Sequence, residues 1–237
     1  MGKNMKQFFL RLACSMAALL PASSVLAADL VEDLRPATYD WSGPYAGVFV
    51  GGTGEFGTTN TTCGACGIYD RELNGWQWNG GFNAGWNYQI DNFVMGVEGD
   101  WAFGGDIAQN HEPAEMLNLA FNDIASIRAR FGFALDRTLV YVTGGFATVN
   151  AEFSSSDYPT FTGGHVSDSN WVNGWVVGGG VEQAFSDNIT GRLEYIYMNL
   201  SDADYTFDDG LGNVAPFTQT FDGIHQIRLG LDYKFGW

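Results

Sequence analysis

Basic residues, prolines and long apolar runs are all scarce in this chain of 237 residues. Only 11 Lys and Arg stand against 27 Asp and Glu, which gives a formal net charge of -16. Because nucleic-acid binding depends on clusters of Lys and Arg that neutralise phosphates, this charge excludes a nucleic-acid partner. After the first thirty residues no apolar run approaches the roughly 18 to 20 residues that a membrane-spanning helix needs. A helical membrane protein is therefore excluded as well.

Hydrophobic and aromatic residues, in contrast, are abundant. They make up 46% and 15% of the chain, beside 32 glycines and only 6 prolines. Such a composition is too apolar for an intrinsically disordered chain. Because the apolar residues are spread thinly rather than gathered in runs, the composition favours a β-rich protein.

The N-terminus has the order of a secretory signal peptide. Three basic residues precede the apolar run 12–20, and small residues follow it. This order predicts export and cleavage after Ala27, so that residues 1–27 are removed. Loss of three positive charges would take the net charge from -16 to -19. Residues 28–43, which carry four acidic side chains, are expected to form an acidic periplasmic arm.

Two cysteines follow the signal segment, Cys63 and Cys66, in a Cys-x-x-Cys arrangement. Redox dithiols and half zinc sites share this spacing, but a second ligand pair and a strand-to-helix junction are both missing. In an exported chain we expect these cysteines to form a small disulfide that closes a loop.

From residue 44 onward apolar and polar residues alternate with a period of two in eight segments. Each segment has about 12 residues, close to the roughly 9 to 11 that a tilted strand needs to cross a bilayer. Strands of soluble proteins average about half that length. The predicted strands are 44–55, 78–90, 93–104, 124–135, 138–149, 171–185, 189–200 and 224–235.

The connections between these strands alternate in length. Tight turns at 91–92, 136–137 and 186–188 alternate with links of roughly twenty residues. Outer-membrane barrels show this alternation, with short turns in the periplasm and long loops outside. The sequence therefore predicts an all-β fold over residues 44–237: an eight-stranded antiparallel up-and-down transmembrane β-barrel with long extracellular loops and short periplasmic turns.

Counting across the tight turns predicts the register of three hairpins. The expected pairs are Ile90 with Phe93, Leu135 with Thr138, and Glu182 with Arg192. With this register every hairpin has one apolar and one polar face. A barrel with its apolar face toward lipid and its polar face toward a narrow lumen gives each face a suitable environment. Its closure leaves no unpaired strand edge.

The polar face carries five acidic and five basic side chains, which would share the lumen. Buried charges persist only when they are paired, so we expect a salt-bridged plug that holds the strand register. A narrow ion path or proton relay is the functional alternative, and a catalytic carboxylate pair a further one. The predicted network consists of Glu98, Asp100, Arg128, Arg130, Glu182, Arg192, Glu194, Arg228, Asp232 and Lys234.

Four stretches resemble a known family. They are Trp-Ser-Gly-Pro-Tyr-Ala-Gly at 41–47, Ala-Leu-Asp-Arg-Thr-Leu-Val-Tyr-Val-Thr-Gly-Gly at 134–145, and Gly-Trp-Val-Val-Gly-Gly-Gly-Val-Glu at 174–182 followed by Arg-Leu-Glu-Tyr-Ile-Tyr at 192–197. They are similar to the small alphaproteobacterial outer-membrane β-barrels, which include surface antigens and haem-binding proteins. The resemblance implies a porin-like eight-stranded barrel that contacts outer-membrane lipid and lipopolysaccharide. It also implies a C-terminal aromatic signal for the barrel-assembly machinery, although here Gly236 and Trp237 follow Phe235.

The function expected from these observations is that of a non-catalytic protein of the Gram-negative outer membrane. The alternative is a surface receptor that binds haem or another small ligand, with His111 and His165 in two long loops as haem ligands. No other cofactor and no metal site are expected. An enzyme would need a Ser or Asp beside a His at the membrane rim, and the one candidate pair, Ser126 and His225, falls on opposite walls of the barrel.

Overall fold

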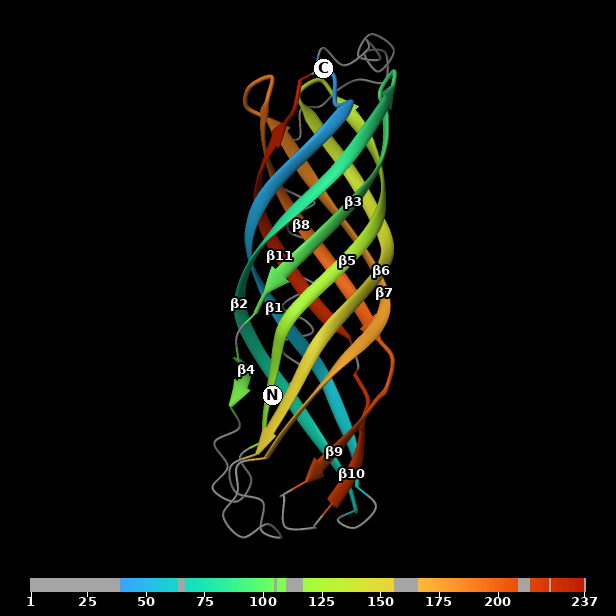
Figure 1. The fold of residues 1–237 in the computed structure, drawn as a ribbon. Coiled ribbons are helices and arrows are strands. Elements are labelled where there is room, and N and C mark those ends of the chain that lie inside the picture. The colour runs from blue at the N-terminus through green and yellow to red at the C-terminus, as the bar shows by residue number, and fades with distance from the viewer. Residues whose placement is uncertain are drawn as a thin grey trace, which may run out of the picture. The chain divides into compact units, whose positions relative to one another are not determined.

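A computed structural model describes residues 39–63, 67–104, 106–109, 117–155, 166–208, 214–221 and 223–236. Within these ranges the chain forms one antiparallel sheet. Eight of its strands surround a central axis (Figure 1). They are β1 (Gly43–Cys63), β2 (Gly67–Ile90), β3 (Phe93–Phe103), β5 (Leu117–Leu135), β6 (Thr138–Ser155), β7 (Val166–Ala184), β8 (Ile189–Leu200) and β11 (Ile224–Lys234).

The ring closes because the first strand pairs with the last. β1 and β11 are antiparallel over eleven residue pairs, from Tyr45 with Lys234 to Glu55 with Ile224. Every strand of the ring therefore has a neighbour on both sides, as the sequence predicted. The predicted hairpin registers are confirmed too, since Ile90 pairs with Phe93, Leu135 with Thr138 and Glu182 with Arg192.

The tight turns explain these registers. Asp91 and Asp136 each open a two-residue turn with a positive φ, of 53° and 54°. Such left-handed backbone favours glycine but is tolerated by Asp and Asn, and two-residue hairpin turns require it. A short aspartate turn therefore fixes which residues face each other across the hairpin.

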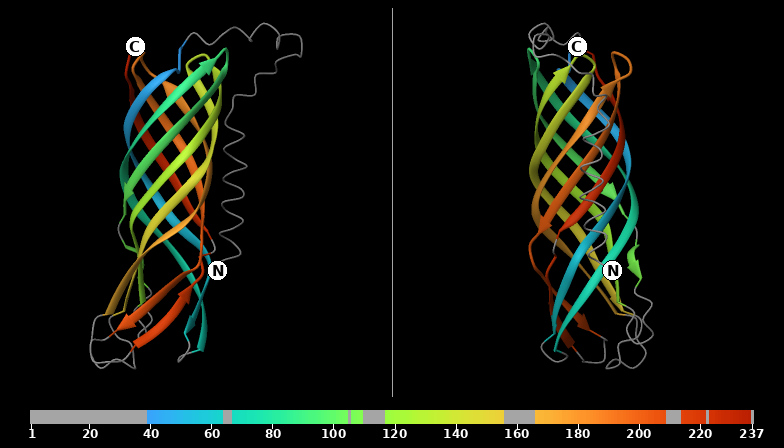
Figure 2. Two further views of the ribbon diagram at one scale, coloured as in Figure 1. Left: turned by 45° about the vertical axis from the view of Figure 1, so that its right-hand side comes forward. Right: turned by 180° about the vertical axis from the view of Figure 1, so that it is seen from behind.

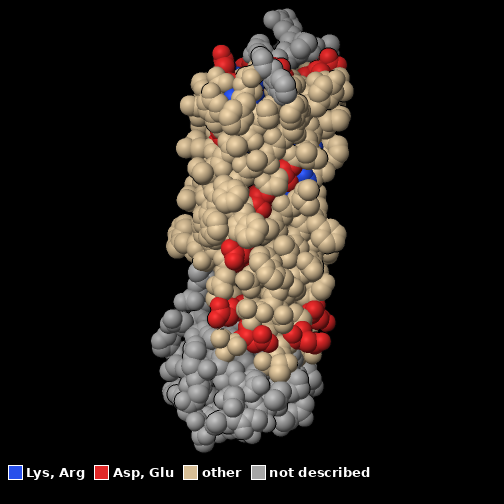
Figure 3. Space-filling model, viewed as in Figure 1, with Lys and Arg blue, Asp and Glu red and all other residues tan. Residues whose placement is uncertain are grey.

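The outer surface of the ring is apolar. Alternate residues of each strand expose Val, Phe, Leu, Ile and Trp side chains; Val142, for example, is 63% exposed. Figure 3 shows a mainly uncharged surface, with acidic side chains at both ends and a few charged ones between them. Among the described residues, no helix is long and apolar enough to cross a membrane.

Several strands run further than the sequence predicted. β1 and β2 continue through much of 56–77, which was expected to be a loop, and β5, β6 and β7 are also extended at the same end. Three short strands were not predicted: β4 (Asp106–Gln109), β9 (Ala203–Asp208) and β10 (Val214–Gln219). β10 pairs with β9 and with the far end of β1. Figure 2 shows this hairpin at the end of the barrel opposite the short turns.

Candidate functional site: the interior of the barrel

Charged side chains meet in the middle of the interior because the register sets them opposite each other at inward-facing positions. The directly opposed pairs are Glu98–Arg128, Glu182–Arg192 and Glu194–Arg228. All six residues are almost completely buried. The strand pairing itself therefore builds the ionic layer that the polar face predicted.

Arg128 lies at the centre of this layer. Its Nη2 atom is 2.5 Å from Oε1 of Glu98 and 3.1 Å from Oδ2 of Asp100. Its Nη1 atom is 2.8 Å from Oε1 of Glu194. A buried guanidinium is strongly unfavourable unless carboxylates surround it, so these contacts compensate the loss of water.

The other three lumen arginines extend the layer around the barrel. Arg228 pairs with Asp100 and Glu194, Arg192 with Glu98 and Asp232, and Arg130 with Glu182. Of the ten side chains predicted to form a network, nine thus make mutual ion pairs. Within this layer of the described structure, four guanidinium groups face five carboxyl groups.

Lys234 does not belong to the layer, and its prediction as a lumen charge is wrong. Its Nζ atom donates a hydrogen bond to the carbonyl of Asp40 and lies 4.4 Å from the centre of the Tyr39 ring. The reason is its position: Lys234 is the last residue of β11, at the end where the short turns lie. There the chain preceding β1 reaches the ammonium group.

Aromatic side chains connect the ion pairs, and the sequence reasoning missed them. The Tyr45 hydroxyl donates to Oε2 of Glu98 at 2.8 Å and accepts from Nη1 of Arg130 at 3.2 Å, which joins the Arg130 pair to the rest. The guanidinium of Arg130 also lies 3.7 Å from the centre of the Tyr141 ring, a cation–π contact. The available signal was their position, because Tyr45 and Tyr141 are aromatic residues on the inward-facing side of their strands.

Glycines provide the room for these side chains. A β-carbon at Gly47 would overlap the carboxylate of Asp232, and one at Gly85 would overlap the Tyr45 ring. Glycine is thus required at both positions because a side chain from the neighbouring strand fills the space above it.

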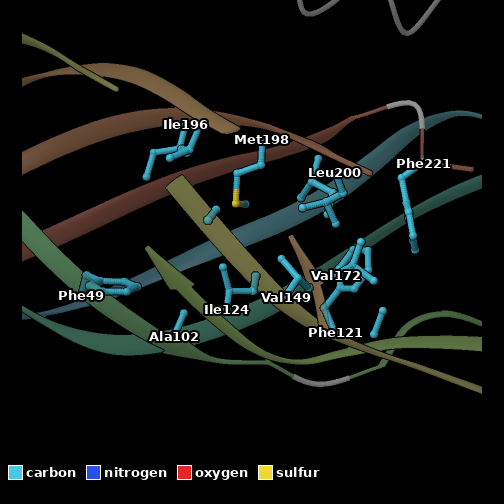
Figure 4. Packing of buried hydrophobic residues seen from close by; sticks show 14 of the residues in the cluster. Phe49, Ala102, Phe121, Ile124, Val149, Val172, Ile196, Met198, Leu200 and Phe221 are labelled. Carbon is cyan, nitrogen blue, oxygen red and sulfur yellow. The ribbon is translucent and has the colours of Figure 1, made fainter. Parts of the chain in front are cut away.

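A second layer, toward the long loops, is apolar. Fifteen buried hydrophobic residues from strands on all sides of the ring pack against each other inside it. Figure 4 shows several of them pointing inward, among them Phe49, Ile124, Val149 and Met198. This part of the interior is a hydrophobic core, which the sequence did not predict.

The β9–β10 hairpin is part of this core. Tyr205 of β9 is 1% exposed and its hydroxyl lies 3.4 Å from the carbonyl of Ala151 on β6. The backbone of the same strand is bound to β7, because Asn170 donates to the carbonyl of Asp204 and Asp168 accepts from the amide of Thr206. The hairpin therefore reaches from β1 to the opposite wall.

A third layer closes the end with the short turns. Tyr39 and Trp41 are nearly fully buried and meet edge to face at 4.8 Å, above Val94 and Leu139. Burial and the nearby carboxylate of Glu182 raise the pKa of Tyr39 to about 12, so the hydroxyl stays protonated and donates to the carbonyl of Asp187. The end of the segment predicted as a periplasmic arm is therefore packed into the barrel.

The remaining predicted residues are distributed as follows. His111, His165 and Cys66 lie outside the described residues, as do residues 1–38, and the Cys63 side chain is not described.

Ser126 faces inward and donates to Asp100, whereas His225 contacts Tyr195 on the outer surface. Three strands separate β5 from β11 around the ring, so no Ser–His pair forms. Within the described ranges, no three His, Cys, Asp or Glu side chains gather as metal ligands would.

Comparison with known proteins agrees with this architecture. Residues 15–235 match the family described as outer membrane protein beta-barrel domain. A 25 kDa outer-membrane immunogenic protein of Brucella canis is 31% identical, over 92% of this chain and 95% of the relative. A 31 kDa outer-membrane immunogenic protein of Brucella melitensis is 30% identical, over 93% and 97%. The crystal structure of OprG from Pseudomonas aeruginosa shares the fold, with a TM-score of 0.52 at 11% identity, over 85% of this chain and all of that one.

Proposed function

This chain belongs to the outer membrane protein β-barrel family and is located in the outer membrane of Gram-negative bacteria, and from that premise we propose that it is a closed, non-catalytic barrel that anchors surface-exposed loops. The observation that carries the proposal is the filling of the interior at three successive levels. From the short turns to the long loops, an aromatic closure, an ionic layer and a hydrophobic core follow one another along the axis. An eight-stranded barrel has an interior just wide enough for side chains, and the filling of its described part supports a lumen without a continuous aqueous path.

Conductance across a planar lipid bilayer tests the closed lumen. The refolded protein should leave the bilayer at its baseline conductance, while a water-filled porin in the same membrane gives clear steps as the positive control. Stable, long-lived openings of this protein would overturn the proposal and favour the narrow-pore alternative.

Display of the loops is supported by the acidic side chains at the end of the barrel that carries the long connections. It is also supported by the relatives, whose names describe them as immunogenic. An epitope tag inserted within residues 156–165 should bind antibody on intact cells. The matched control places the same tag in the 136–137 turn, where binding should require permeabilised cells. Equal labelling of both tags on intact cells would contradict the orientation.

A further inference from the structure

The ionic layer has one carboxyl group more than it has arginines, and Lys234 does not supply the missing charge. Its ammonium group is bound to the Asp40 carbonyl and the Tyr39 ring at the mouth of the barrel. A closed, low-dielectric interior strongly disfavours an uncompensated negative charge. The excess must therefore be neutralised inside the layer itself.

The distances single out which carboxyl group is in excess. Glu98, Asp100 and Glu194 each have an arginine nitrogen within 2.8 Å. Glu182 is in direct contact with Arg130. Asp232, in contrast, has among the described residues only Nε of Arg192, at 3.4 Å, as a basic partner, and the Nη1 atom of that arginine is paired with Glu98.

The surroundings of Asp232 supply little positive charge from any side. From β2, Asn83 donates to Oδ1 at 2.6 Å, while Oδ2 has no hydrogen-bond donor among the described residues. On β1 the residue opposite is Gly47, which has no side chain. On β8 the residue opposite is Thr190, whose hydroxyl donates to Glu182 instead.

The other charged groups near Asp232 do not change this balance. Glu182 on β7 and Glu98 on β3 are acidic and add negative potential. The attraction from Arg192 on β8 is the contact of 3.4 Å described above. Lys234, two residues along β11, donates to the Asp40 carbonyl at the mouth of the barrel. Both neighbouring acids are in direct contact with arginines, Glu98 with Arg128 and Glu182 with Arg130, so Asp232 is the group for which neutralisation by a proton costs least.

We propose that Asp232 is a proton-binding site of the folded barrel, carrying one proton as a neutral carboxylic acid at neutral pH. Four ionised carboxylates then balance four guanidinium groups. In the unfolded chain the same aspartate is ionised at neutral pH, since its ordinary pKa is near 3.9. Folding therefore takes up one proton, and stability falls as the pH rises above about 4, until the folded carboxyl group also ionises.

Infrared spectroscopy of the protein refolded in lipid vesicles detects the proton directly. At pH 7 the wild type should show the carbonyl stretch of a protonated carboxyl group, and Asp232→Asn should lack it. Asp187→Asn, which removes a carboxylate from an exposed turn, is the matched control and should keep the band. Absence of the band from the wild type, or its persistence in Asp232→Asn, would overturn the assignment.

The pH dependence of unfolding provides a second measurement. Between about pH 6 and pH 8 the unfolding equilibrium constant of the wild type should rise by up to about tenfold per pH unit relative to that of Asp232→Asn. Identical pH dependences of the two proteins would contradict the proposal. Should Asp232→Asn fail to fold, the infrared band of the wild type alone still decides whether a buried proton exists. Neither result depends on whether the lumen conducts.

Discussion

The outward side of a single strand, β6, is apolar in one half of the strand and polar in the other. Near the short turns Val140 and Val142 face outward and are exposed, whereas near the loops Val149 and Ala151 face inward and are fully buried. Outward positions in that second half are Asn150 and Glu152. The alternation of sides never breaks, but the outward side changes from apolar to polar, although Leu139 shows that the inward side also buries apolar residues near the short turns.

The difference shows where the surroundings of the wall change. A wall in lipid is stable with its apolar side outward, whereas a wall in water must bury its apolar side. Trp101 and Trp171 meet edge to face at the transition, with ring centres 6.2 Å apart. Because tryptophan is enriched at membrane interfaces, the pair indicates where the bilayer ends. On the loop side of the pair, the wall has the polarity of a barrel in water.

The largest expected effect comes from removing the centre of the ionic layer. Arg128→Ala leaves three buried carboxylates without their shared partner, and we expect a loss of about 3–5 kcal/mol of unfolding free energy. Urea titration of the protein refolded in lipid measures it. Arg137→Ala is the control, because its ion pair with Asp187 is exposed and should contribute less than about 1 kcal/mol. Equal losses would mean that burial does not determine the strength of these pairs.

Two isoleucines of β5 test the hydrophobic core against the lipid-facing surface. Ile124 is fully buried inside the barrel and Ile127 is 67% exposed outside it. Ile124→Ala should destabilise by about 2–5 kcal/mol because it leaves a cavity in a packed interior. Ile127→Ala should lose clearly less in the same urea titration, since lipid fills the space. The reverse order would contradict the division into two halves.

A charge on the outer surface tests where lipid surrounds the wall. Val97 is 58% exposed on β3, and Val97→Arg should cost about 2–4 kcal/mol if the side chain lies near the bilayer midplane. Ser169→Arg, at an exposed outward position of β7 on the loop side of Trp171, should change the folding free energy in vesicles by less than about 1 kcal/mol. Folding of Val97→Arg as stable as the wild type would show that this face does not contact lipid.

The smallest effect expected is that of the hydroxyl that joins the ion pairs. Tyr45→Phe removes the bond to Glu98 and the acceptor for Arg130, and should cost about 1–3 kcal/mol. Tyr233→Phe, at an exposed position on β11, is the control and should be close to neutral. Loss of stability by both variants to the same extent would remove the argument for a connected network.

Much of the ring could be predicted because hairpin registers are local. A two-residue turn beginning at Asp136 fixes the pairing of Leu135 with Thr138, and strict alternation then assigns every other residue of both strands to one face. The ionic residues followed, since charges on the inward face of a closed barrel need partners. Haem ligation by His111 and His165 and the disulfide between Cys63 and Cys66 stay predictions.

Other features depend on contacts between distant segments and have no local signal. Val149 and Ala151 alternate with polar residues just as a lipid-facing strand does, so the sequence alone does not show on which side of the barrel they lie. Lys234 continues the alternation of β11, yet it is bound by Asp40, almost two hundred positions earlier in the chain. The β9–β10 hairpin consists of two short strands that are held by Ala151 and Asp168 on other walls.

The sequence by itself determined the class of the protein, its closed ring of strands and the inward position of its charges, because period-two alternation and tight turns act over a few residues. Only the tertiary structure decided how the interior is filled. Three layers of different chemistry, the closure by Tyr39 and Trp41, and the excess carboxyl group at Asp232 arise from side chains that meet across the lumen. Their partners depend on the circumference and stagger of the closed barrel, which no single strand encodes.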